Sequence, residues 1–194
     1  SPAVKTNQDA PLTASLLANL NAFLFDFAAR RRVGGTDLNH FIVHQLPVLT
    51  PSLYSERSAE FGAPMFRDWA LARVLELVYT AWDLQSFAAD CGYNGPPFRW
   101  DEERRFLFRC ELDAAFFHLY LGSESDWAKE PESLTKAFPT PRHAVNYIME
   151  TFPIVKRKDD AEFGEYLMYA GARDNEELAK LCTPYKDFGL LGAQ

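Results

Sequence analysis

The chain has 194 residues, of which 47% are hydrophobic and 14% aromatic, and its net charge is −7. This composition is typical of a globular protein and excludes wholesale disorder. No stretch approaches about 18 consecutive apolar residues, so we expect no membrane span and no membrane partner. We also expect no secretory signal. Three cysteines without CxxC spacing fit a reducing compartment, so we expect a cytoplasmic protein.

Charge is distributed unevenly along the chain. Residues 1–53 carry four Lys and Arg against three Asp and Glu, whereas residues 54–194 carry sixteen against twenty-four. An acidic protein does not coat nucleic acid, so any contact with DNA should be local.

The first predicted helix begins at Pro11. Leu and Phe recur at helical spacing from there until the Gly34-Gly35 pair, which we expect to end the helix. A short second helix should follow and run to about His44.

Two long helices are predicted after a connector at 52–64, which is rich in Ser, Gly and Pro. Apolar residues cover nearly every face of 65–90 and of 101–121, as expected of buried helices. Residues 122–139 are polar and should be irregular, and shorter helices are predicted at about 141–151, 159–170 and 174–182. The predicted fold class is mainly α, with little or no β structure.

Gly95-Pro96-Pro97-Phe98 is similar to the Pro-Pro-aromatic part of the adenine-N6 methyltransferase signature. That chemistry needs an Asp or Asn directly before the prolines, where this chain has Gly95, and its aromatic residue stacks on a flipped base. The chain also has no GxGxxG loop. We therefore interpret this segment as a turn that breaks the helices, and we predict no catalytic residue.

Asp37, His40 and His44 share one face of the short second helix, at spacings that can suit a metal. No further strong ligand or HExxH motif accompanies them, so we predict no metal site. Cys110 falls within a buried pattern and should be an inert core residue.

A line of charged residues runs along the helix predicted at 101–121: Glu102, Arg105, Arg109 and Asp113. Such a line fits a buried functional network or a ladder of ion pairs that ties helices together, and we favour the ladder.

Two basic runs are the candidate DNA contacts: Arg30, Arg31 and Arg32, and Lys156, Arg157 and Lys158. Arginines at a helix end also complement the helix dipole, so part of each run should be structural. Three arginines beside the Gly34-Gly35 turn nevertheless suit a phosphate backbone, because side chains and exposed amides both donate to phosphates.

Several separated blocks resemble the C-terminal region of large bacterial adenine-N6 DNA methyltransferases, both the fused type IIG restriction–modification enzymes and their relatives in phage-defence systems. The first block resembles the end of the target-recognition region and includes Leu16 to Asn21, Gly34 to Thr36, Asn39 and Gln45 to Pro47. The later blocks are Arg73 to Leu77, Tyr79 to Asp83, Gly95 to Arg105, Cys110 to Ala115 and Tyr147 to Lys156. The resemblance covers about residues 12–165, and the last thirty residues depart from it.

The resemblance implies a C-terminal piece of a longer enzyme. It would divide into a flexible lead-in (1–10), the end of the target-recognition region (11–51), the connector (52–64) and a C-terminal helical domain (65–194). The catalytic motifs and the S-adenosylmethionine site would lie upstream, so this fragment itself would need no cofactor.

The expected partners are therefore double-stranded DNA and the upstream methyltransferase domain of the same protein. The resemblance adds Asn39, beside the arginine run and the Gly34-Gly35 pair, to the expected DNA-binding residues. The alternative is a helical module that docks the subunits of a defence complex without touching DNA. An independent small enzyme is a third possibility, but nothing in the sequence demands one.

Overall fold

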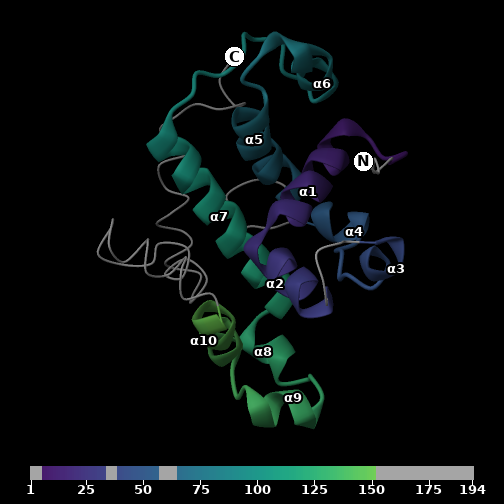
Figure 1. Ribbon diagram of the computed structural model, residues 1–194, viewed down its shortest axis with the longest axis vertical. Coiled ribbons are helices and arrows are strands. Elements are labelled where there is room, and N and C mark those ends of the chain that lie inside the picture. The colour runs from purple at the N-terminus through teal and green to yellow at the C-terminus, as the bar shows by residue number, and fades with distance from the viewer. Residues whose placement is uncertain (1–5, 34–38, 57–64, 152–194) are drawn as a thin grey trace.

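The computed structural model describes residues 6–33, 39–56 and 65–151. Every regular element in these ranges is a helix (Figure 1), which confirms the mainly α prediction. The predicted helices at 159–170 and 174–182 lie outside the described residues. The elements in chain order are α1 (Ala10–Asn21), α2 (Phe23–Arg32), α3 (His40–Val43), α4 (Pro51–Tyr54), α5 (Phe66–Val78), the 3-10 helix η2 (Trp82–Leu84), α6 (Gln85–Asp90), α7 (Glu102–Leu121), α8 (Glu124–Trp127), α9 (Glu132–Ala137) and α10 (Pro141–Thr151).

The first predicted helix is in fact two helices, α1 and α2, which meet at an angle of 58°. The prediction of one helix was wrong because Ala22 takes an extended conformation, with ψ of 144°. Asp9 caps the N-terminus of α1 by accepting a hydrogen bond from the Leu12 N–H at 2.9 Å. The N-terminus of α2 has no cap from its own segment, and the Phe23 N–H donates instead to Oδ1 of Asp113 on α7, at 2.6 Å.

The prediction of one continuous helix over 65–90 was also wrong. Helix α5 ends before Tyr79, whose side chain is fully buried, and the chain then forms η2 and α6. The carbonyl of Tyr79 accepts a hydrogen bond at 2.8 Å from the N–H of Phe98, which lies in the loop before α7. This contact from a distant segment takes the place of a further helical turn.

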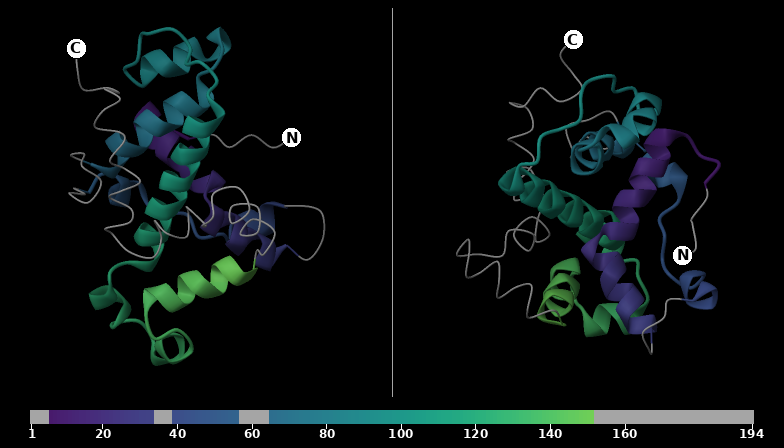
Figure 2. Two further views of the ribbon diagram at one scale, coloured as in Figure 1. Left: turned by 90° about the vertical axis from the view of Figure 1, so that its left-hand side faces the viewer. Right: turned by 45° about the horizontal axis from the view of Figure 1, so that its top comes forward.

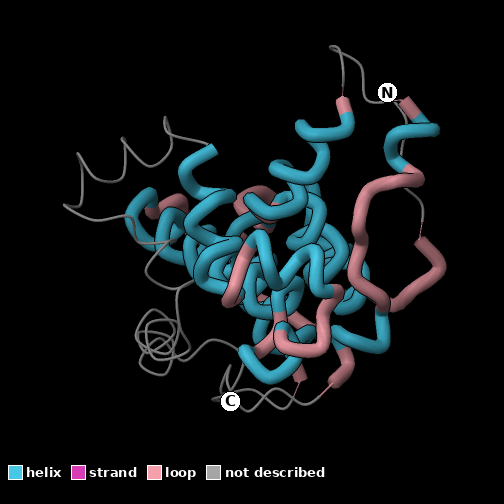
Figure 3. The backbone as a smooth tube through the Cα atoms, turned by 90° about the horizontal axis from the view of Figure 1, so that it is seen from below, coloured by secondary structure: helices cyan, strands magenta, loops and turns pink. Residues whose placement is uncertain are grey.

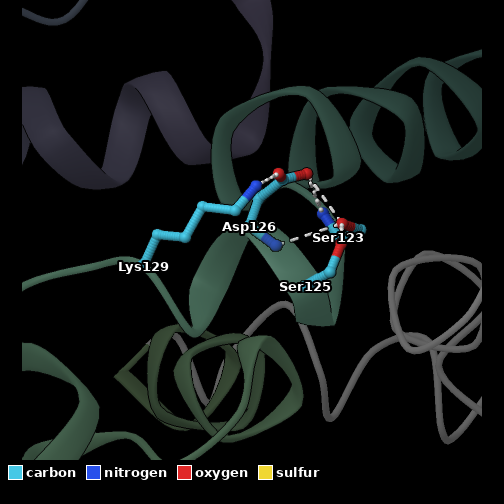
Figure 4. A network of polar contacts seen from close by, with 4 residues as sticks. All are labelled: Ser123, Ser125, Asp126 and Lys129. Atoms are coloured by element: carbon cyan, nitrogen blue, oxygen red, sulfur yellow. Dashed lines mark hydrogen bonds and ion pairs between the residues drawn. The ribbon is translucent and has the colours of Figure 1, made fainter.

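Helices α7 and α10 confirm the predictions at 101–121 and 141–151. The stretch 122–139, predicted as irregular, was wrong in part because it contains the short helices α8 and α9. A capping box begins α8 (Figure 4): Ser123 Oγ accepts from the Asp126 N–H at 3.2 Å, and the Asp126 carboxylate accepts from the Ser123 N–H at 3.4 Å. The same carboxylate also accepts from the Ser123 hydroxyl at 2.7 Å. These bonds and the Lys129 ammonium lower the pKa of Asp126 to about 2.

Two hydrophobic clusters form the core. The larger one lies between α1, α5 and α7 and includes Trp69, Leu75 and Phe116. The smaller one lies between α2, α7 and α10, and includes Phe117 and Ile148. Helix α7 contributes residues to both clusters. Figure 2 shows it as a long helix, and in Figure 3 the helices gather at the centre with loops around them. Helices from both sides of the predicted connector at 52–64 share the larger cluster.

Two polar arrangements tie the helices together inside the core. Arg73 of α5 pairs with Glu111 of α7 at 2.7 Å, and both side chains are almost completely buried. Asn19 of α1, fully buried, accepts from the Tyr54 hydroxyl at 2.9 Å and the Leu49 N–H at 3.2 Å, and donates to the Tyr120 hydroxyl at 2.7 Å. The chain between α3 and α4 is thereby fixed against α1 and α7.

No single helix in the described part of the chain combines the length and apolar character that crossing a membrane would need; the bent pair α1 and α2 meets that test only when the two are taken together.

Candidate nucleic-acid interface

The three arginines of the first basic run occupy the last turn of α2. Earlier in this helix, Phe23, Leu24 and Phe27 pack against the smaller hydrophobic cluster. Packing of these three side chains holds the helix against the cluster, and all three arginines are exposed.

Each arginine has a different neighbour, and we call the three together the arginine surface. Arg30 pairs with Asp26 one turn earlier, with Nε 2.8 Å from the carboxylate. Arg31 donates to the Tyr147 hydroxyl of α10 at 3.2 Å, and its guanidinium lies 5.3 Å from the centre of the Phe27 ring. Arg32 donates to the side-chain oxygen of Gln45 at 3.3 Å.

Arg31 and Arg32 carry most of the charge that this surface presents. Within the described ranges, their hydrogen-bond partners are a hydroxyl and an amide, and no carboxylate lies within ion-pair distance of either. The sequence from 38 to 55 contains no Asp, Glu, Lys or Arg, so α3 and the chain after it add no carboxylate to this region. Among the described residues, a phosphate approaching from this side would meet two guanidinium groups that have no carboxylate partner.

Asn39 is the N-cap of α3, and its Oδ1 accepts a hydrogen bond from the Ile42 N–H at 3.0 Å. The oxygen therefore has a structural role, and the amide nitrogen of this exposed side chain has no hydrogen-bond partner within the described residues. The other predicted DNA-binding residues, Gly34, Gly35, Lys156, Arg157 and Lys158, lie outside the described residues.

Phe98 of the Gly95-Pro96-Pro97-Phe98 segment is enclosed by other aromatic rings. It stacks on Tyr93 with ring centres 4.9 Å apart and meets the edge of Tyr79 at 6.5 Å. Gly95 is required here because a Cβ would lie 2.5 Å from the Tyr93 hydroxyl. The predicted turn between helices is confirmed, and this ring is occupied by packing rather than open to a base.

The rings of His40 and His44 stack with their centres 6.3 Å apart, and Asp37 lies outside the described residues. In the ranges that the structure describes, no group of three or more His, Cys, Asp or Glu side chains could hold a metal ion. Cys110 is buried in the smaller cluster, as predicted.

The charged line of α7 forms no continuous ladder of ion pairs. Glu102 and Arg109 approach to 3.7 Å, but Arg105 lies over the Trp100 ring and Asp113 binds the start of α2. The ion pairs that connect α5 with α7 use Arg104 and Glu111, which lie beside this line, with Glu76 and Arg73 as their partners.

Sequence reasoning missed a groove between α1, α5 and α7, which Arg105, Arg109 and Asp113 line together with apolar residues. The charged line was the available signal, since it marks one wall, but the opposite wall comes from helices distant in sequence.

The chain matches no family model, and the searches of curated proteins and of solved structures returned no match either.

Proposed function

We propose that this chain is a non-catalytic helical module that contacts the backbone of double-stranded DNA through the arginine surface. It would serve as the C-terminal part of a site-specific adenine-N6 DNA methyltransferase of the restriction–modification or phage-defence type. The observation that carries the DNA contact is the exposure of Arg31 and Arg32 without carboxylate partners in the described ranges, beside a segment free of acidic residues.

Charge and geometry support phosphate as the ligand. A guanidinium presents several N–H groups in a plane and pairs with phosphate oxygens through two hydrogen bonds. The weak bonds of Arg31 to Tyr147 and of Arg32 to Gln45 hold the side chains in place without neutralising them. The negative end of the α2 dipole lies at the same place, so the side chains must supply the attraction.

The methyltransferase assignment rests on the resemblance of the sequence blocks. The cofactor S-adenosylmethionine and the catalytic motif would belong to the upstream domain, with which this module would pack. If the complete reading frame lacked an upstream methyltransferase signature, this assignment would be contradicted. If it contained one and the full-length protein methylated adenine in DNA, the assignment would be supported.

The second candidate is a module that docks a protein partner without touching DNA. The exposed apolar side chains on and after α3 favour it: Phe41 is 76% exposed, Val43 42% and Val48 44%. Exposed apolar side chains that gather at a surface are typical of protein-binding sites, and these three lie within eight residues of one another in the sequence. They lie near Arg32, so the two candidates compete for neighbouring parts of the molecule.

Fluorescence anisotropy of the 194-residue chain on random-sequence duplex DNA, measured across a salt series, tests the proposal. The variant is Arg31→Ala/Arg32→Ala, and the matched control is Lys129→Ala/Lys136→Ala, which removes the same charge from two exposed lysines of the α8 and α9 region. Removal of one phosphate-binding cation should reduce the slope of log K against log salt by about 1. Circular dichroism checks that both variants fold.

We expect the arginine variant to bind weakly and with a lower salt slope, whereas the lysine variant keeps the slope of the original chain. Equal losses of affinity in the two variants would show only a general effect of charge and would contradict a contact at the arginine surface. Absence of binding at low salt by the folded chain would favour the docking module.

A further inference from the structure

A groove of about 410 Å³ lies between α1, α5 and α7, apart from the arginine surface. Its apolar wall includes Leu17 of α1 and Val74 and Leu77 of α5, and α7 lines it with Arg105 and Asp113. Small-molecule sites in proteins have volumes of about 300–1,000 Å³ and combine apolar walls with a few polar groups. The groove has both properties.

The charged groups of the groove follow one line along α7, with Arg109 between Arg105 and Asp113, and Asn21 of α1 adds a polar side chain. Arg105 and Asp113 are eight residues apart on α7, which separates them by about 12 Å along the helix axis. Asp113 lies at the break between α1 and α2, where it binds the Phe23 N–H, and Arg105 lies at the end of α5, where it donates to the Glu76 carbonyl at 3.3 Å. Between Arg105 and Asp113, apolar residues of α1 and α5 line the groove together with Arg109 and Leu112 of α7.

Arg105 is a half-buried cation without a carboxylate partner among the described residues. Its guanidinium lies 3.7 Å from the centre of the Trp100 ring and donates to a backbone carbonyl. The nearby Glu76 carboxylate is bound by Arg104, whose Nη2 donates to it at 2.8 Å. Arg109, the other arginine of the groove, approaches Glu102 at 3.7 Å. The end of the groove at Arg105 therefore offers positive charge to an anion.

We propose that this groove binds a medium-chain aliphatic carboxylate. The carboxylate pairs with the guanidinium of Arg105, and the aliphatic chain lies against Leu17, Val74 and Leu77. Burial of the chain supplies most of the affinity, and the charge-assisted hydrogen bonds set the direction of the ligand. The Asp113 carboxylate is at the far end, where the apolar tail and not the anionic head approaches it.

Isothermal titration calorimetry of the 194-residue chain with decanoate and with decylamine, both below their micelle-forming concentrations, tests this site. Three variants are compared. Arg105→Gln removes the charge, Arg99→Gln removes an exposed arginine that does not line the groove, and Leu17→Trp fills the groove from the surface of α1. Circular dichroism checks the fold of each.

We expect decanoate to bind the original chain and the Arg99→Gln variant equally, and decylamine to bind at least about tenfold more weakly. Arg105→Gln should weaken decanoate binding by about tenfold, the effect of removing one charge-assisted hydrogen bond. Leu17→Trp should abolish it.

The proposal is overturned if the folded chain does not bind decanoate, if decylamine binds equally well, or if the folded Arg105→Gln variant keeps the original affinity. If Arg105→Gln fails to fold, Leu17→Trp decides, because Leu17 is 39% exposed and its replacement leaves the core intact. Unchanged binding by that variant would then refute the site.

Discussion

The Asp113 carboxylate of α7 accepts a hydrogen bond at 2.6 Å from the backbone N–H of Phe23, the first residue of α2. A side chain ninety positions away thus does what an N-cap residue does within its own segment. It binds one of the N–H groups that the start of a helix leaves without a partner. This contact lies at the bend between α1 and α2, and the arginine surface lies at the other end of α2.

Asp113→Asn should make the protein more stable at alkaline pH. Burial raises the pKa of Asp113 to about 7, against the opposing effect of the Phe23 N–H. The pKa of Asp113 is therefore higher in the folded protein than in the unfolded chain, where it is about 4. Asp113 adds most to the free energy of unfolding below about pH 4, and this contribution is lost as the pH rises toward 7. An asparagine oxygen keeps the hydrogen bond without the charge. The stability difference between variant and original should therefore grow by about 2 kcal/mol between pH 5 and pH 8.

Urea unfolding at several pH values measures this difference directly. Asp126→Asn serves as the control, since Asp126 is exposed and its pKa is lowered to about 2, so its effect should be constant above pH 5. A difference that stays constant for Asp113→Asn over the same range would contradict a raised pKa.

Breaking the buried pair of Arg73 and Glu111 should be costly. Burial raises the pKa of Glu111, and the Arg73 guanidinium opposes that rise. In Arg73→Met the carboxylate loses its cation, so we expect a loss of about 3–5 kcal/mol in the free energy of unfolding. The loss should be larger at pH 8 than at pH 5, because at the lower pH the unpaired Glu111 can bind a proton.

The double variant Arg73→Met/Glu111→Leu removes both charges and should recover at least half of that stability. Chemical denaturation of the single and double variants compares them. If the double variant is no more stable than Arg73→Met, the missing packing of the arginine over the Trp69 ring, at 3.6 Å, accounts for the effect instead.

The helices that sequence reasoning predicted well are those whose signals are local. Helix α7 has Asp101 as its N-cap and Gly122, with φ of 69°, at its end, and both are visible in the sequence. The breaks at Ala22 and Tyr79 have no Gly or Pro to announce them. They depend on contacts from Asp113 and Phe98, which belong to distant segments, and a periodic pattern carries no information about such contacts.

The same distinction applies to the candidate sites. A run of arginines at the end of a helix is a local signal, and it predicted an exposed basic surface. The groove was beyond prediction because its walls come from three helices. Leu17 and Leu77 are ordinary apolar positions in the sequence, and only the packing of α1 on α5 leaves space beside Arg105.

Phe98→Ala should reduce stability and leave binding to DNA unchanged. The ring packs against Tyr93 and Tyr79, so its removal leaves a cavity next to the end of α5. We expect a loss of about 2–3 kcal/mol, at the low end for a Phe because this side chain is only partly buried. Thermal unfolding and anisotropy on duplex DNA test the two parts. Weaker DNA binding by a folded, fully stable variant would instead favour a base-stacking role for this ring.

Asn19 and Tyr54 should be strongly coupled in a double-mutant cycle. The Tyr54 hydroxyl donates to the Asn19 amide oxygen at 2.9 Å inside the core, and burial raises the pKa of Tyr54, so this hydroxyl stays protonated as a donor. Tyr54→Phe removes one hydrogen bond and should cost about 1 kcal/mol. Asn19→Ala removes the partner of the Tyr54 hydroxyl, the Leu49 N–H and the Tyr120 hydroxyl, and should cost about 3 kcal/mol.

The double variant should lose about 1 kcal/mol less stability than the sum of the two single losses, because the bond between the two side chains can be removed only once. Urea denaturation of the four proteins gives this coupling energy. Thr50→Ala is the matched control, since its exposed hydroxyl meets the Ser52 hydroxyl at 2.9 Å and not Asn19, and its effect should add to that of Asn19→Ala without coupling. Simple additivity of Asn19→Ala and Tyr54→Phe would mean that the network does not act as a unit. The chain between α3 and α4 would then be held by the packing of Tyr54 on Phe66, whose ring centres are 5.9 Å apart.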